Sequence, residues 1–153
     1  MAHGITTVRE PGGRGIDWAL NLKKLSAENK IVAPRIFAYT SFGQTGKNFN
    51  PLNGAPISNP EMARSWVRAN AKKGADGIKF FGAEPEIMSA ALDENKKLGL
   101  GSAAHHAQLN VVKWNVLNSA RAGLNSMEHW YGLPEALFSD RIIQNYPPYY
   151  NCL

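Results

Sequence analysis

The chain has 153 residues and a formal net charge of +5, and 44% of its residues are hydrophobic. This length suits one domain with a core, and a single cysteine excludes a disulfide scaffold. No apolar run approaches the roughly 18 residues of a membrane span, and no signal-peptide pattern opens the chain, so we expect no membrane partner and a cytoplasmic location by default. Basic and acidic residues are interleaved, which is typical of a solvated surface.

Short segments of small and β-branched residues alternate with amphipathic segments along the chain. The alternation predicts strands over residues 4–8, 35–40, 77–81, 101–105 and 125–129. It predicts helices that begin at Asp17, Asn59, Pro85, about Leu109 and Leu133. The second helix has the clearest start, because Asn59 is a good N-cap, Pro60 suits the first turn and Glu61 lies near the positive end of the helix dipole.

Strands that alternate with helices at this spacing indicate an α/β fold, in which helices cover a parallel sheet. The strands carry few charges, as is typical of strands buried on both faces. The loop over residues 41–58 is rich in Gly, Asn and Pro, and loops of this length usually have a function, so we expect it on the rim of a site. The Tyr- and Pro-rich residues 139–153 give no clear prediction.

Three consecutive helix–strand units end in a polar residue at a similar distance from a helix-ending glycine. Lys79 follows Gly74 by five residues, whereas His105 and His129 each follow their glycine by six. Parallel α/β folds place their chemistry at the carboxyl ends of the strands. We therefore expect Lys79, His105 and His129 to meet at one site.

Two imidazoles beside a lysine suggest a metal site only if the lysine is modified. A free ammonium has no lone pair, so Lys79 becomes a ligand only when its neutral amine is carboxylated to a carbamate. Two histidines and a carbamate suit a zinc-like ion, or two ions bridged by the carbamate. The competing interpretation is that each histidine is a structural, hydrogen-bonded residue and that Lys79 extends to water.

His105 and His106 are adjacent, and adjacent residues of a regular strand point to opposite faces. The spacing from Gly99 favours His105 as the ligand and leaves His106 as the alternate. By the same alternation, we expect Glu128 to face away from His129 and to have a structural role.

Four segments carry a family resemblance. They are residues 4–13 (Gly-Ile-Thr-Thr-Val-Arg-Glu-Pro-Gly-Gly), 74–79 (Gly-Ala-Asp-Gly-Ile-Lys), 104–108 (Ala-His-His-Ala-Gln) and 122–129 (Ala-Gly-Leu-Asn-Ser-Met-Glu-His). In this order they resemble strands two, four, five and six of the metal-dependent amidohydrolase superfamily, close to its imidazolonepropionase-like and prolidase-like members. In that family the fourth strand ends in a metal-bridging carboxylated lysine, and the fifth and sixth strands each carry a histidine ligand.

The resemblance implies a TIM-type (β/α)8 barrel that hydrolyses amide or cyclic amide bonds with a metal-activated water. It implies that Lys79 bridges the metals and that His105 and His129 ligate one of them. The expected cofactor is a divalent metal, zinc, as one or two ions. The expected partner is a small-molecule or peptide-like substrate.

Two ligand groups of that family are missing from this chain. The family's first strand carries a His-x-His pair, whereas the upstream histidine here is His3 alone. Its eighth strand carries an Asp, and Asp140 follows the sixth-strand segment too closely to take that place. A complete barrel needs about 250 residues. We therefore interpret residues 1–153 as a single partial barrel, from the second to the sixth strand, and expect it to be marginally stable, to self-associate and to have little activity alone.

Two other classes of function are alternatives. A non-catalytic α/β module would bind a small molecule, with His105 and His129 as structural residues. A weak nucleic-acid binder is suggested by the charge alone. No basic cluster or stacking platform accompanies that charge, so we expect no nucleic-acid partner.

Overall fold

The computed structural model describes residues 3–43, 57–107, 110–138, 140 and 141. In chain order these form β1 (Thr7–Glu10), α1 (Ile16–Ala27), β2 (Arg35–Gly43), α2 (Pro60–Lys73), β3 (Gly77–Gly82), α3 (Pro85–Lys97), β4 (Gly101–His105), α4 (Val116–Arg121), β5 (Ser126–Glu128) and α5 (Leu133–Ala136). This order confirms the predicted alternation of strands and helices.

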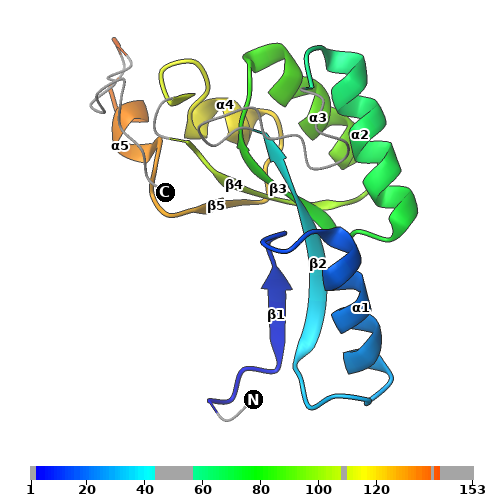
Figure 1. The fold of residues 1–153 in the computed structure, drawn as a ribbon. Coiled ribbons are helices and arrows are strands. Elements are labelled where there is room, and N and C mark those ends of the chain that lie inside the picture. The colour runs from blue at the N-terminus through cyan, green and yellow to red at the C-terminus, as the bar shows by residue number, and fades with distance from the viewer. Residues whose placement is uncertain (1–2, 44–56, 108–109, 139, 142–153) are drawn as a thin grey trace.

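The five strands form one sheet in the order β1-β2-β3-β4-β5, and every pair of neighbours is parallel. The sheet curls into a half-barrel, with helices α1 to α4 on its outer side (Figure 1). The predicted α/β class with five parallel strands and covering helices is therefore confirmed.

The main core lies between the sheet and helices α2 and α3. Its fully buried side chains include Phe42, Ile78, Phe80, Val67, Met88 and Leu92. The ring of Trp66 on α2 meets the ring of Phe42 edge-on, with 5.2 Å between the ring centroids. A smaller cluster of Ile16, Ala19, Ala38 and Ala75 fixes α1 to β2. Burial of these side chains is the main term that holds the helices on the sheet.

Helix α2 begins and ends as the sequence predicts. The Asn59 side chain accepts a hydrogen bond of 2.9 Å from the backbone N–H of Met62, and Pro60 is the first helical residue. Gly74 ends the helix in the left-handed conformation, with φ of 104°. A residue with a Cβ would be strained there, which explains why glycine separates α2 from β3.

The helix predicted from about Leu109 is wrong in its first half. Turns occupy the chain from Asn110 to Trp114, and α4 begins only at Val116. The reason is Asn115, whose side chain accepts from the N–H groups of Leu117 and Asn118 in a capping box. An N-cap residue has extended backbone, so the helix starts after it.

The inner face of the sheet is less covered than the sequence predicts. In β2, residues at even positions from Ile36 to Phe42 are buried, whereas those at odd positions from Arg35 to Gly43 are exposed or half-buried. Only β3, in the middle of the sheet, is buried along nearly its whole length. Burial of the strands on both faces is therefore confirmed for β3 but not for β2, because the curl leaves the inner side open to solvent.

Some boundaries differ from the predictions, and some predictions lie outside the described residues. β1 is shifted from 4–8 to Thr7–Glu10, and β2 runs three residues beyond the predicted end. Most of the predicted rim loop, 44–56, and most of the tail, 142–153, fall outside the described ranges. None of the helices within the described ranges combines the length and the apolar character that crossing a bilayer demands.

Candidate functional site

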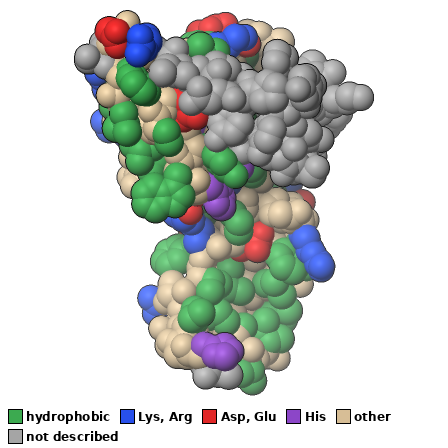
Figure 2. Space-filling model, turned by 90° about the vertical axis from the view of Figure 1, so that its left-hand side faces the viewer, with side chains coloured by type: hydrophobic (Ala, Val, Ile, Leu, Met, Phe, Trp, Pro, Cys, Tyr) green, Lys and Arg blue, Asp and Glu red, His purple; other side chains and the backbone are tan. Residues whose placement is uncertain are grey.

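Strand register places two of the three predicted residues on the inner face of the sheet. Lys79 on β3 is level with Ala103 on β4, and His105, two residues further along β4, is level with Glu128 on β5. Residues two apart in a strand share a face, so Lys79, His105 and Glu128 lie on the same side. Figure 2 shows histidine, basic and acidic side chains gathered near the waist of the molecule.

His129 joins His105 through a bend at the end of β5. His129 and Trp130 both have left-handed backbone, with φ of 70° and 73°. This bend sets the His129 ring against the His105 ring, with 5.1 Å between centroids. Tyr131 continues the cluster, since its ring centroid lies 4.9 Å from that of His105. Two left-handed residues without glycine cost about 1–3 kcal/mol each, which the surrounding contacts must offset.

Lys79 lies in the middle of β3 rather than at its carboxyl end. It is level with Ala103, two residues before His105 on β4. The Lys79 Nζ lies 5.6 Å from the centroid of the ring of Phe81, two residues further along β3 on the same face. Phe81 in turn packs on His105, with 5.3 Å between ring centroids. Lys79, Phe81 and His105 are therefore linked by contact, and His129 joins them through His105.

Burial makes the Lys79 amine easier to deprotonate. The side chain is 5% exposed, and the pKa falls from 10.5 to about 8, chiefly because burial penalises the charged form. Glu128 raises this pKa and Arg9 lowers it further. Near pH 8 a large share of the amine is therefore neutral and carries the lone pair that a free ammonium lacks.

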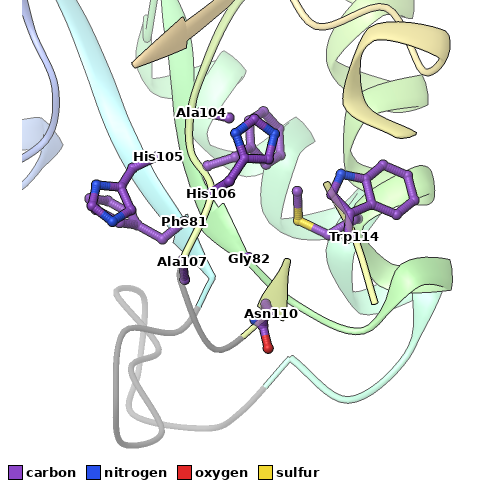
Figure 3. A pocket seen from close by; sticks show the side chains of 10 residues that line it. Phe81, Gly82, Ala104, His105, His106, Ala107, Asn110 and Trp114 are labelled. Atoms are coloured by element: carbon purple, nitrogen blue, oxygen red, sulfur yellow. The ribbon is translucent and has the colours of Figure 1, made fainter. Parts of the chain in front are cut away.

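His106 lies on the opposite side of β4, as Figure 3 shows. It is 4% exposed, and its Nε2 lies 2.8 Å from the Ser119 hydroxyl, which also accepts a 2.7 Å hydrogen bond from the Trp114 indole N–H. Its pKa is lowered to about 4, first by burial and then by the nearby His105 and Lys79. Of the two adjacent histidines, only His105 faces the side of Lys79.

A small cavity lies at the carboxyl ends of β3 and β4, with both His105 and His106 among its lining residues. It measures about 10 Å³, which is room for one water molecule. His106 and Asn110 are among its lining residues, and His106 Nδ1 has no hydrogen-bond partner among the described residues. The cavity is too small for a substrate, so it does not define a substrate pocket.

The expectation that Glu128 faces away from the site is wrong. The strand ends at Glu128 and the backbone turns at His129, so the alternation that predicted opposite faces does not continue. Glu128 lies on the face of His105 and accepts a 2.5 Å hydrogen bond from Arg9. Although burial opposes ionisation of Glu128, the Ser126 hydroxyl and the Arg9 guanidinium lower its pKa overall.

Arg9 was missed by the sequence reasoning. It belongs to β1, yet it contacts Ser126 and Glu128 on β5, which lie 117 and 119 residues further along the chain. The signal in the sequence was one arginine within a short strand of β-branched residues. A buried or half-buried charge needs a partner of opposite charge, so the arginine indicated a contact elsewhere in the fold.

The donor set fits a divalent ion if Lys79 is carboxylated. Two nitrogens bound to one zinc lie within about 4 Å of each other, and two rings with the observed spacing can meet this condition. Within the described ranges, no three His, Cys, Asp or Glu residues form a group that could hold a metal. For a metal to be held here, a third ligand would have to come from Lys79 or from residues outside those ranges.

Comparison with known proteins gives likenesses of structure alone. No protein-family model matches the sequence, and neither does any curated protein. A Xaa-Pro dipeptidase with methionine bound in its active site is 25% identical over 81% of this chain and 36% of its own length, with a TM-score of 0.64. A protein from Bifidobacterium longum assigned as a prolidase is 28% identical over 81% of this chain and 32% of its own, with a TM-score of 0.59.

A third solved structure, bottromycin amidohydrolase, covers 85% of this chain and 28% of its own length, with a TM-score of 0.61. At 22% identity this likeness concerns the fold alone. The chain spans about a third of the length of the structures it matches. The structural neighbours of the half-barrel are thus hydrolytic enzymes of the peptidase and amidohydrolase type.

Proposed function

We propose that this chain is part of a TIM-type (β/α)8 barrel of a metal-dependent hydrolase that cleaves carbon–nitrogen bonds. The observation that carries the proposal is the inner-face cluster, in which Lys79 and His105 share a face and the His129 ring packs on His105. The likeness to a Xaa-Pro dipeptidase and a prolidase-like protein supports the same class of reaction. Peptide-like or cyclic amide substrates suit that class.

Lys79, His105 and His129 would hold a divalent metal, zinc, as one or two ions. The neutral Lys79 amine attacks carbon dioxide, an N–C bond forms, and loss of the amine proton leaves a carbamate whose oxygens can ligate. When bound, the ion lowers the pKa of water and polarises the scissile carbonyl. The two imidazoles would each supply a ring nitrogen as ligand, and the aromatic rings of Phe81 and Tyr131 pack against the His105 ring.

We also propose that the isolated chain is marginally stable, self-associates and has little activity. Within the described residues, β1 pairs only with β2 and β5 pairs only with β4, so each has one open edge. Open edges and an uncovered inner face favour association. Neither the first-strand His-x-His pair nor the eighth-strand Asp that the family resemblance calls for is supplied by this sequence.

Metal binding tests the proposal directly. With zinc and bicarbonate at pH 8, we expect the purified chain to bind zinc stoichiometrically, and with 13C-bicarbonate to give a carbamate NMR signal. Lys79→Ala should lose both, because in this proposal the carbamate forms on the Lys79 amine. Lys72→Ala, at an exposed position of α2, serves as the control and should keep both. Absence of bound zinc from the wild-type chain would instead favour the non-catalytic binding module.

A further inference from the structure

Arg9 crosses the inner face of the half-barrel and joins its two outer strands. Its Nη2 donates a 2.5 Å hydrogen bond to Glu128 Oε1, and its Nη1 donates a 2.9 Å bond to the Ser126 hydroxyl. The Ser126 hydroxyl donates to the same Glu128 oxygen at 2.9 Å. One arginine of β1 thus holds both ends of β5.

The guanidinium is itself held in place. It lies over the Tyr39 ring of β2, 5.3 Å from the ring centroid. Since β1 is at one end of the strand order and β5 at the other, the contact spans the interior of the curl rather than a neighbouring ladder. Such a planar, multiply bonded guanidinium has a defined position that lysine cannot reproduce fully.

β5 needs this support more than the other strands. It has only three residues, of which Ser126 and Glu128 are the ones bonded to Arg9, and among the described residues it pairs with β4 alone. Directly after Glu128 comes the strained bend of His129 and Trp130. A bend that costs free energy relaxes unless its neighbours fix it. The position of the His129 ring therefore depends on what holds Glu128.

We propose that Arg9 is a positioning residue, which fixes the end of β5 through Ser126 and Glu128 and so sets the His129 ring against His105. Its importance for metal binding rests on the function proposed above. The contrasting interpretation is a partly exposed ion pair, since the side chains of Arg9 and Glu128 are 35% and 25% exposed. Such pairs typically contribute no more than about 1 kcal/mol and need not affect any site.

The two interpretations differ in what Arg9→Met changes. This variant keeps much of the side-chain length and removes all donors. If Arg9 positions β5, NOE cross-peaks between the ring protons of His105 and His129 should weaken strongly in the metal-free protein, and the zinc dissociation constant should rise about tenfold or more. Arg9→Lys keeps the charge and should restore both in part. Thermal unfolding followed by circular dichroism verifies that each variant is folded.

Arg68→Met is the matched control. Arg68 also donates to two carboxylates, Glu61 at 2.5 Å and Glu94 at 3.1 Å, but on helices α2 and α3, away from the inner face. Arg68→Met should leave the NOEs between the His105 and His129 rings and the zinc affinity unchanged. Wild-type ring NOEs that persist in Arg9→Met would overturn the positioning role. If the wild type binds no zinc but Arg9→Met still loses the NOEs, the metal function fails while the role of Arg9 stands.

Discussion

Gly77→Ala is expected to destabilise the fold by about 3 kcal/mol, a large share of the 5–15 kcal/mol that a typical domain has. Tyr39, Gly77 and Gly101 are level on β2, β3 and β4, and the Tyr39 side chain extends over the two glycines. A Cβ at Gly77 would lie 2.3 Å from Tyr39 Cζ and 2.6 Å from the backbone oxygen of Gly101. The backbone oxygen cannot move without breaking the ladder between β3 and β4.

Gly101→Ala should cost less, about 1–2 kcal/mol, because its clash is with a movable group. There the new Cβ would lie 1.9 Å from the Tyr39 hydroxyl oxygen. Tyr39→Phe removes that oxygen and should recover much of the loss in the double variant. The same substitution should not rescue Gly77→Ala, since Cζ and the Gly101 oxygen remain.

Urea unfolding of the single and double variants measures these couplings. Gly13→Ala is the control, because a Cβ there meets its nearest neighbour, a Glu10 side-chain oxygen, at an ordinary 3.7 Å. It should change the free energy of unfolding by less than about 0.5 kcal/mol. Equal rescue of both glycine variants by Tyr39→Phe would contradict the placement of Tyr39 across β3 and β4.

The sequence predicted the parts of the fold that local chemistry determines. Alternating segments predicted five parallel strands, Asn59 and Pro60 predicted the start of α2, and the bounds of β4 are as predicted. The shared face of Lys79 and His105 followed from strand periodicity and from the spacing of the units. These features depend on contacts within about one helix–strand unit.

Features that depend on the curl of the whole sheet were not predictable. The contact between Arg9 and Glu128 joins strands that are not neighbours in the sheet, so no pattern in either strand indicates it. The orientation of Glu128 was predicted wrongly because the alternation was extended into a residue, His129, whose backbone is left-handed. Non-glycine residues rarely adopt this conformation, and tertiary contacts rather than local propensity impose it here.

Acidification from pH 6.5 to pH 4 is expected to remove about 3 kcal/mol of stability through His106 alone. In the folded chain its pKa is about 4, against 6.5 for an ordinary histidine. Between these values the unfolded chain binds a proton that the folded chain excludes, so the free energy of unfolding falls as the pH falls. Well above pH 6.5 both states are neutral at this residue and its contribution is constant. A difference of about 2.5 pH units corresponds to roughly 3 kcal/mol.

Burial, rather than the hydrogen bonds around Ser119, explains why protonation of His106 is resisted. The indole N–H of Trp114 can only donate, so it occupies one lone pair of the Ser119 oxygen. The second lone pair of that oxygen can accept from a protonated His106 Nε2, and the hydroxyl proton can be donated to an unprotonated one, so the contact is compatible with either state. What resists protonation is burial of the charged imidazolium, followed by the repulsion from His105 and Lys79.

His106→Gln removes the titration and keeps a polar side chain. Urea unfolding at pH 7.5 and pH 4.5 should show that the wild type loses more stability on acidification than His106→Gln does, by about 2–3 kcal/mol. His3→Gln is the control, because His3 is exposed and precedes β1. On acidification this variant should lose as much stability as the wild type does. NMR titration provides a second measurement, in which the pKa of His106 should lie well below the 6.5 of an ordinary histidine. An apparent pKa of His106 near 6.5 in the folded protein would mean that burial at this position does not exclude the proton.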